Sequence, residues 1–269
     1  MKNTMIKNTG KLLVVMAMFS GVAMAETTPP ESGAVKGDIV KLVDIAGKQR
    51  MLSQNIAKNY LYVGKKIATA KARKQLKNSL SELLSSHKKL TASINDPDIN
   101  NLLAFVEMSS EDFKATAHEP FSLENAQLVM DLSESMLEGS QYVVDSLKDS
   151  VKMNESVIVG LAGKQRMLSQ RIAKYYIAYQ AGIKDKNTVD QMNLAVSSFV
   201  AAHNALLINK TNTPAINRKL NDIDRLWKIV YKFYLNIEKG GLPLIVYNTT
   251  DNITKKMNEV TKLYVDLAK

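Results

Sequence analysis

Apolar residues recur at helical spacing through residues 35–63, a stretch that contains no proline. The leucine spacing over residues 76–90 indicates a second amphipathic helix, which should end near Asp96-Pro97 because proline disfavours helix in the residue before it. A third helix is expected over residues 98–117, and a fourth from Ser122, whose hydroxyl can cap it. The period-two alternation of half-buried strands is absent. The pattern therefore predicts an all-α protein.

A nine-residue segment occurs twice in the chain. The letters AGKQRMLSQ at residues 46–54 are repeated without change at residues 162–170, an offset of 116. The expected helix breaks also recur in the second half, at residues 182–187, 213–214 and 240–243. We therefore expect two tandem four-helix up-down bundles, at residues 26–150 and 151–269.

The junction between the two halves allows two arrangements. No proline or turn cluster interrupts residues 122–180, so the last helix of the first bundle could continue into the second as one rod of about 59 residues, roughly 90 Å long. A rod would separate the repeated segments and favour a parallel homodimer. A bend near residues 152–154 would instead let the two copies pair within one chain, as an intramolecular pseudo-dimer. Because no proline or glycine lies at the junction, the sequence favours the rod.

Residues 1–25 have the pattern of a secretory signal peptide. Three lysines flank or precede a short apolar stretch at residues 12–23, and Ala23-Met24-Ala25 matches an A-x-A cleavage site. The stretch is too short for a permanent membrane span. We expect cleavage after Ala25 and a periplasmic location, with an uncleaved N-terminal anchor as the alternative.

Composition excludes several kinds of chemistry. The 269 residues include no cysteine, which excludes a thiolate nucleophile, Cys-ligated zinc and an iron–sulfur cluster. No nucleophile–base set, phosphate loop or metal-ligand spacing is found, so we expect no enzyme activity, no cofactor and no metal. The net charge of +10 falls to +7 without the three lysines of the leader, which has no acidic residue. The remaining lysines are scattered, and nucleic acid is not an expected partner.

The repeated segment carries the candidate chemistry. At about 100° per residue, its glycine, arginine and last glutamine fall on the helix face away from the bundle core. Arginine presents a planar fork of donors that matches planar oxyanions, and a helical glycine costs about 1 kcal/mol relative to alanine, so its presence in both copies suggests a close approach. The alternative is an ordinary helix–helix seam. The candidate ligand-binding residues are Gly47, Arg50, Gln54, Gly163, Arg166, Gln170 and Arg171.

The letters AGKQRMLSQRIAK at residues 162–174 closely resemble the start of the PilJ-type domain, the N-terminal sensor region of type IV pili methyl-accepting chemotaxis transducers. That domain is related to the periplasmic sensor domain of the NarX/NarQ nitrate and nitrite kinases. The resemblance implies a four-helix bundle, usually dimeric, in which nitrate lies between two copies of one arginine, here Arg50 and Arg166. The first copy has Asn55 where the second has Arg171, so we expect Arg166→Ala to weaken binding more than Arg50→Ala.

The resemblance implies a sensor for a small oxyanion, with nitrate or nitrite as the first choice. Family sensors continue into a kinase or methyl-accepting domain that this sequence does not contain, so the signal is expected to pass to a separate membrane sensor kinase or chemoreceptor. The alternative is a ligand-free protein-interaction module for a type IV pilus, chemoreceptor or sensor-kinase system. Tyr175, Tyr176 and Tyr179, just beyond the second segment, favour that alternative as possible docking anchors.

Overall fold

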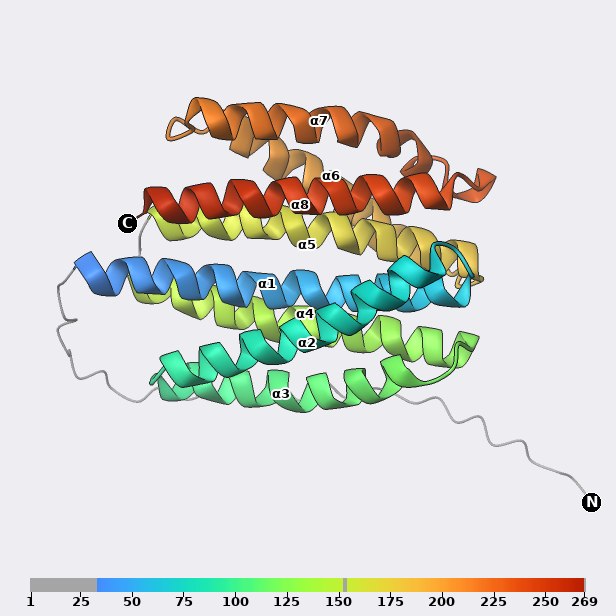
Figure 1. The fold of residues 1–269 in the computed structure, drawn as a ribbon, viewed down its shortest axis with the longest axis horizontal. Helices are drawn as coiled ribbons and strands as arrows, with labels where there is room; N and C mark the ends of the chain where they lie inside the picture. The colour runs from blue at the N-terminus through green and yellow to red at the C-terminus, as the bar shows by residue number, and fades with distance from the viewer. Residues whose placement is uncertain (1–32, 152–153, 269) are drawn as a thin grey trace, which may run out of the picture. The chain divides into compact units, whose positions relative to one another are not determined.

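The computed structural model of this chain describes residues 33–151 and 154–268 (Figure 1). Within these ranges the chain forms eight α-helices, one short 3-10 helix and no strand, which confirms the all-α prediction. The expected signal peptide at residues 1–25 and its cleavage site lie outside the described residues. Among the helices described, none combines the length and the apolar character needed to cross a membrane.

The helix boundaries follow the proline and capping signals of the sequence. Side chains of Asp96, Ser122 and Thr213 accept hydrogen bonds from backbone N–H groups at the starts of three helices, and prolines occupy the first helical position after two of them. The first half contains α1 (Gly33–Gly64), α2 (Thr69–Ser93), α3 (Pro97–His118) and α4 (Leu123–Val151). The second half contains α5 (Asn154–Ala181), α6 (Lys186–Leu207), α7 (Pro214–Tyr234), η1 (Ile237–Lys239) and α8 (Pro243–Leu267).

The helices pack in two sets of four that meet along α1 and α5. In the first set α1 contacts α2 and α4, and α3 contacts α4; in the second, α5 contacts α6 and α8, and α7 contacts α8. The largest contact of all joins α1 to α5, which lie side by side in Figure 1. All described helices form one compact unit, so the domain limits of 26–150 and 151–269 stay a prediction.

The chain reverses direction between α4 and α5. As the colours of Figure 1 show, α4 runs opposite to α1, whereas α5 runs parallel to it. The expectation of one continuous rod is therefore wrong: α4 and α5 are separate helices, and α1 packs against α5 within the chain, as in the intramolecular alternative. The hydrogen bonds that fix these directions join Arg50 to Gln141 and Gln54 to Ser133 across α1 and α4, and Arg50 to Gly160 and Asn55 to Gln170 across α1 and α5.

Helix α1 is enclosed on three sides, by α2, α4 and α5. Every residue from 49 to 62 is buried, including Leu52 and Ile56, while Ile45 is half-buried. A helix that is buried all round normally carries apolar residues all round. This one instead buries arginine, lysine and amide side chains, which bond to residues of α4, α5 and α8.

The apolar core of the first half can be tested with two phenylalanines on α3. Phe113 is fully buried, whereas Phe105 is 47% exposed. We expect Phe113→Ala to lower the free energy of unfolding by about 3–5 kcal/mol and Phe105→Ala by about 1 kcal/mol or less, since only the first leaves a cavity. Urea denaturation of both variants measures the difference, and equal losses would contradict the described packing.

Candidate functional site

The two copies of the repeated segment face each other across α1 and α5. Arg50 and Arg166 are each only 2% exposed. A Cβ atom placed on Gly163 would lie 3.2 Å from the Nη2 atom of each arginine, and one placed on Gly47 would lie 3.1 Å and 3.5 Å from the same two nitrogens. The structure therefore brings four of the seven candidate residues together, with the two guanidinium groups sharing the space above the two glycines. Arg50 and Arg166 are called the arginine pair below.

Each member of the arginine pair is held in the same way. Its Nη1 atom donates to a side-chain amide oxygen on the last helix of its own half, and its Nη2 atom lies 3.4 Å from a backbone carbonyl on the first helix of the other half, a long hydrogen bond. The partners are Gln141 (2.5 Å) and the Gly160 carbonyl for Arg50, and Asn258 (3.2 Å) and the Asp44 carbonyl for Arg166.

Charge compensation differs between the two arginines. The Nη2 atom of Arg166 lies 2.7 Å from the Asp44 carboxylate. Within the described parts of the chain, no carboxylate lies within 4 Å of Arg50. Burial, and then repulsion from Arg166, lower the pKa of Arg50 to about 10, although Asp145 raises it in part. Arg50 thus remains a buried cation at neutral pH without a direct counter-ion.

The arginine pair also holds unused hydrogen-bond donors. The Nε atoms of Arg50 and Arg166 are both buried, and neither has a partner among the residues described. A buried donor without an acceptor costs about 1–3 kcal/mol. Two like charges with spare donors in a place shielded from water form an arrangement that a small anion with several acceptor oxygens would stabilise.

The two candidate glutamines lie one turn further along and are bound within the protein. Gln54 donates to the Ser133 carbonyl at 2.8 Å, and Gln170 donates to the Thr254 hydroxyl at 2.6 Å. Gln170 also accepts a hydrogen bond from Asn55 at 2.8 Å, so it connects α5 to α1. These contacts hold the helices that carry the arginine pair in their alignment.

Arg171 lies apart from the arginine pair. It donates to both carboxylate oxygens of Glu134, at 3.2 Å and 2.5 Å, and to Gln191 at 3.0 Å. Five residues of helix turn it about 140° away from Arg166, so the two side chains leave α5 on different faces. The structure thus removes the reason for expecting Arg166→Ala to be the more damaging change.

Two buried ion pairs that the sequence analysis missed cross between the halves. Lys58 on α1 contacts Asp251 on α8 at 2.6 Å, and Lys174 on α5 contacts Glu134 on α4 at 2.5 Å. Both lysine side chains are fully buried. The sequence contains a signal for these pairs, because the two lysines are separated by 116 residues and the two acids by 117, close to the repeat offset. Each half therefore supplies the counter-ion for the buried lysine of the other half.

The pKa values of one pair show how strongly it is coupled. Burial disfavours the Glu134 carboxylate, but attraction to Lys174 and Arg171 and their hydrogen bonds outweigh it and lower the pKa of Glu134 to about 2. Burial also lowers the pKa of Lys174 to about 8, against the attraction of Glu134. Both groups are charged at neutral pH, and each depends on the other.

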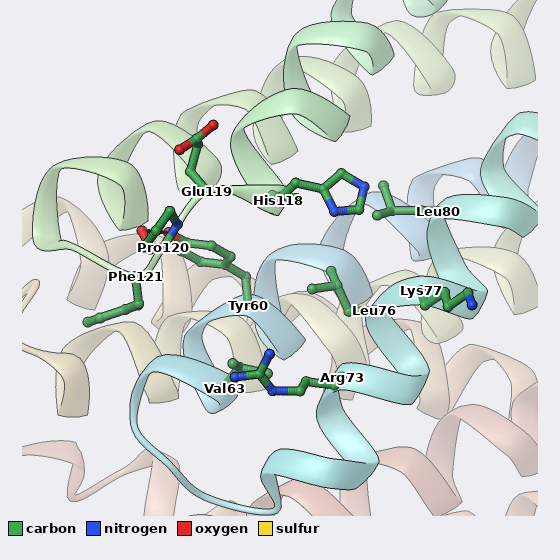
Figure 2. Close-up of a pocket in the computed structure, with 11 residues that line it drawn as sticks. Tyr60, Val63, Arg73, Leu76, Lys77, Leu80, His118, Glu119, Pro120 and Phe121 are labelled. Carbon is green, nitrogen blue, oxygen red and sulfur yellow. Dashed lines mark hydrogen bonds between the residues drawn. The ribbon is translucent and has the colours of Figure 1, made fainter.

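A second candidate site is a hollow of about 580 Å³ near the ends of α1, α2 and α3 (Figure 2). Its cations, Arg73 and Lys77 on α2, are exposed to solvent, so they have lost little hydration. The arginine pair is the better anion site because its charges are buried. The hollow is lined by Tyr60, Val63, Arg73, Leu76, Lys77, Leu80, Ala117, His118, Glu119, Pro120 and Phe121.

The role of Glu134 as a counter-ion can be tested directly. We expect Glu134→Gln to lower the free energy of unfolding at pH 7 by about 3–5 kcal/mol, because Lys174 and Arg171 would stay buried without it. The pKa of Glu134 in the folded protein is about 2 instead of 4.5, so its contribution is full above pH 4.5 and is lost as the pH falls toward 2. Urea denaturation at several pH values should show the two proteins converging over that interval.

The control is Glu138→Gln, which removes an exposed acid from the same helix. It is expected to change the free energy of unfolding by about 0.5 kcal/mol or less. An effect of Glu134→Gln no larger than that of the control would show that the cross-half ion pair is not formed.

The close approach at Gly47 can be tested against Gly37 on the same helix. A Cβ atom on Gly37 meets nothing within 4 Å, so Gly37→Ala should raise the free energy of unfolding by about 1 kcal/mol through helix propensity. At Gly47 the added atom crowds both guanidinium groups, so we expect Gly47→Ala to gain nothing or to lose stability. Thermal unfolding measures both, and equal gains would refute the crowding.

Comparison with known proteins bears on the second half of the chain. No curated protein and no solved structure matches the chain. Residues 150–239 match the model of the PilJ family, described as "Type IV pili methyl-accepting chemotaxis transducer N-term". The match contains Gly163, Arg166, Gln170 and Arg171, whereas the relation to NarX/NarQ and the tandem copies stay predictions. Residues 150–239 are thus similar to the PilJ family, which suggests a signalling module related to chemotaxis transducers in this part of the chain.

Proposed function

We propose that this protein binds a small oxyanion, nitrate or nitrite first, between Arg50 and Arg166. The observation that carries the proposal is the pair of buried guanidinium groups above two glycines, with one direct carboxylate partner among the described residues. Like charges at this depth repel each other strongly because water screens them little. An anion between them would replace that repulsion with two attractions and supply acceptors for the unused donors.

The chemistry of the pair favours a planar, singly charged ligand. A guanidinium group is a flat fork of N–H donors, and it matches the edge of a flat oxyanion better than a point cation does. Glycine at positions 47 and 163 leaves no side chain to compete for the space beside the guanidinium groups. Both arginines come from one polypeptide, so the proposed site requires one chain.

We further propose that ligand binding in the periplasm is relayed to a separate partner, a membrane sensor kinase or chemoreceptor, and that no chemical step takes place. The match of residues 150–239 to a chemotaxis transducer family supports a signalling role. The α1–α5 contact offers a route, since an anion that draws the arginine pair together would act on both first helices.

The ligand-free alternative loses the observation that favoured it. Tyr175 and Tyr176 are buried at 3% and 0% exposure, and Tyr179 is half-buried against the core. They therefore contribute to packing inside the second half and do not form a row of exposed anchors.

The proposal predicts that both arginines are required for anion binding. We expect nitrate at 100 times its dissociation constant to stabilise the unmodified protein by about 2.7 kcal/mol relative to chloride at equal ionic strength. Arg50→Met and Arg166→Met should each abolish that gain. Without ligand, Arg50→Met should not destabilise the fold, because it removes one of two repelling buried charges. Thermal unfolding and calorimetric titration measure these effects.

The control is Arg73→Ala, which removes an exposed arginine from the hollow of Figure 2. It should leave the response to nitrate unchanged. If no oxyanion stabilises the unmodified protein beyond chloride, or if Arg73→Ala alone abolishes the response, the arginine pair is not the binding site.

A further inference from the structure

The backbone carbonyls that face the arginine pair are matched between the halves, but the side chains at these two positions differ. Asp44 on α1 and Gly160 on α5 are separated by the repeat offset of 116 residues. Each places its backbone carbonyl 3.4 Å from the Nη2 atom of the arginine on the opposite helix. Only Asp44 adds a side chain, whose carboxylate lies 2.7 Å from Arg166. One arginine thus has an internal anion beside it and the other has none.

We propose that the Asp44 carboxylate competes with the ligand for Arg166 and restricts the site to singly charged anions. This inference rests on the proposed function of the arginine pair. The two guanidinium groups carry two positive charges and Asp44 carries one negative charge, so one further negative charge balances the group. A doubly charged anion would leave an excess negative charge in a buried place, which is costly.

Neighbouring charges do not change this balance. Lys48 pairs with Glu82 on α2, so this cation and acid cancel each other. On the other side Asp145 pairs with Lys148 at 2.5 Å, so these two residues together add no net charge, although Asp145 also attracts Arg50. The net charge to be filled by a ligand is therefore set by the arginine pair and Asp44.

The position of Asp44 suits a group that gives way to a ligand. Its side chain is 30% exposed, whereas that of Arg166 is 3% exposed. It lines a hollow of about 410 Å³ between α1 and α2, so the carboxylate can turn toward water without leaving its helix. The Oδ1 atom that contacts Arg166 makes no hydrogen bond, so the ligand would displace an ion pair and not a directed hydrogen bond.

The test is Asp44→Asn, which keeps the backbone carbonyl and removes the charge. We expect the affinity for nitrate to rise about tenfold, which corresponds to 1.4 kcal/mol. The affinity for sulfate should rise more than that for nitrate, because the site then presents two uncompensated positive charges. Calorimetric titration of the full chain with nitrate, sulfate and chloride gives the three dissociation constants.

The reciprocal change uses the matched position in the other half. A Cβ atom on Gly160 would meet the flexible Lys148 side chain at 3.2 Å, which can move aside. Gly160→Asp would add a carboxylate at the position matched to Asp44, whose backbone carbonyl faces Arg50, and we expect it to weaken nitrate binding about tenfold or more. Gly160→Asn is the control for size and should bind nitrate as the unmodified protein does.

The outcomes separate the two proposals. If nitrate binds the unmodified protein and Asp44→Asn leaves its affinity equal or lower, the role of Asp44 is overturned and the arginine site stands. Equal nitrate affinities of Gly160→Asp and Gly160→Asn would also overturn the role of Asp44 and leave the arginine site standing. If neither the unmodified protein nor Asp44→Asn binds nitrate or sulfate more tightly than chloride, the proposed function itself fails.

Discussion

Two parallel helices that bury polar side chains against each other have very few ways to align, and α1 and α5 are such a pair. Buried donors and charges without a partner are costly, and a shift of one turn would leave several more of them without one. The contacts that fix this alignment are Asn55 to Gln170, Lys58 to Asp251 and Lys174 to Glu134. The same alignment places Arg50 opposite Arg166, so the candidate site follows from the way the two halves dock.

Much of the fold could be read from the sequence because its signals are local. Proline, the capping side chains and the leucine spacing act within a few residues, and they placed both ends of α3 and the start of α7 correctly. The reversal after Val151 could not be read in this way, since it is imposed by contacts between helices that lie far apart in the sequence. Local propensity has little influence where a long buried interface decides the path of the chain.

Part of the candidate site could also be predicted from the sequence, and part could not. The identity of the repeated segment and its helical geometry identified Arg50, Arg166 and the glycine beside each, because both copies use the same face of their helix. The place of Arg171 apart from the arginine pair could not be read in this way, because the acid that holds it, Glu134, lies 37 residues earlier on another helix. Sequence spacing reports which residues share a helix face, whereas the partner across an interface depends on tertiary packing.

Joining both arginines in one polypeptide has a consequence for how the site can change. In a symmetric dimer every substitution appears twice, so the two sides of a shared site remain identical. Here each side is encoded separately, and Asp44 opposite Gly160 shows that the two sides already differ in charge. Covalent linkage also keeps the two helices together at any protein concentration, so assembly of the site does not depend on how much protein is present. In a single chain, the surroundings of one arginine can therefore change while those of the other stay the same.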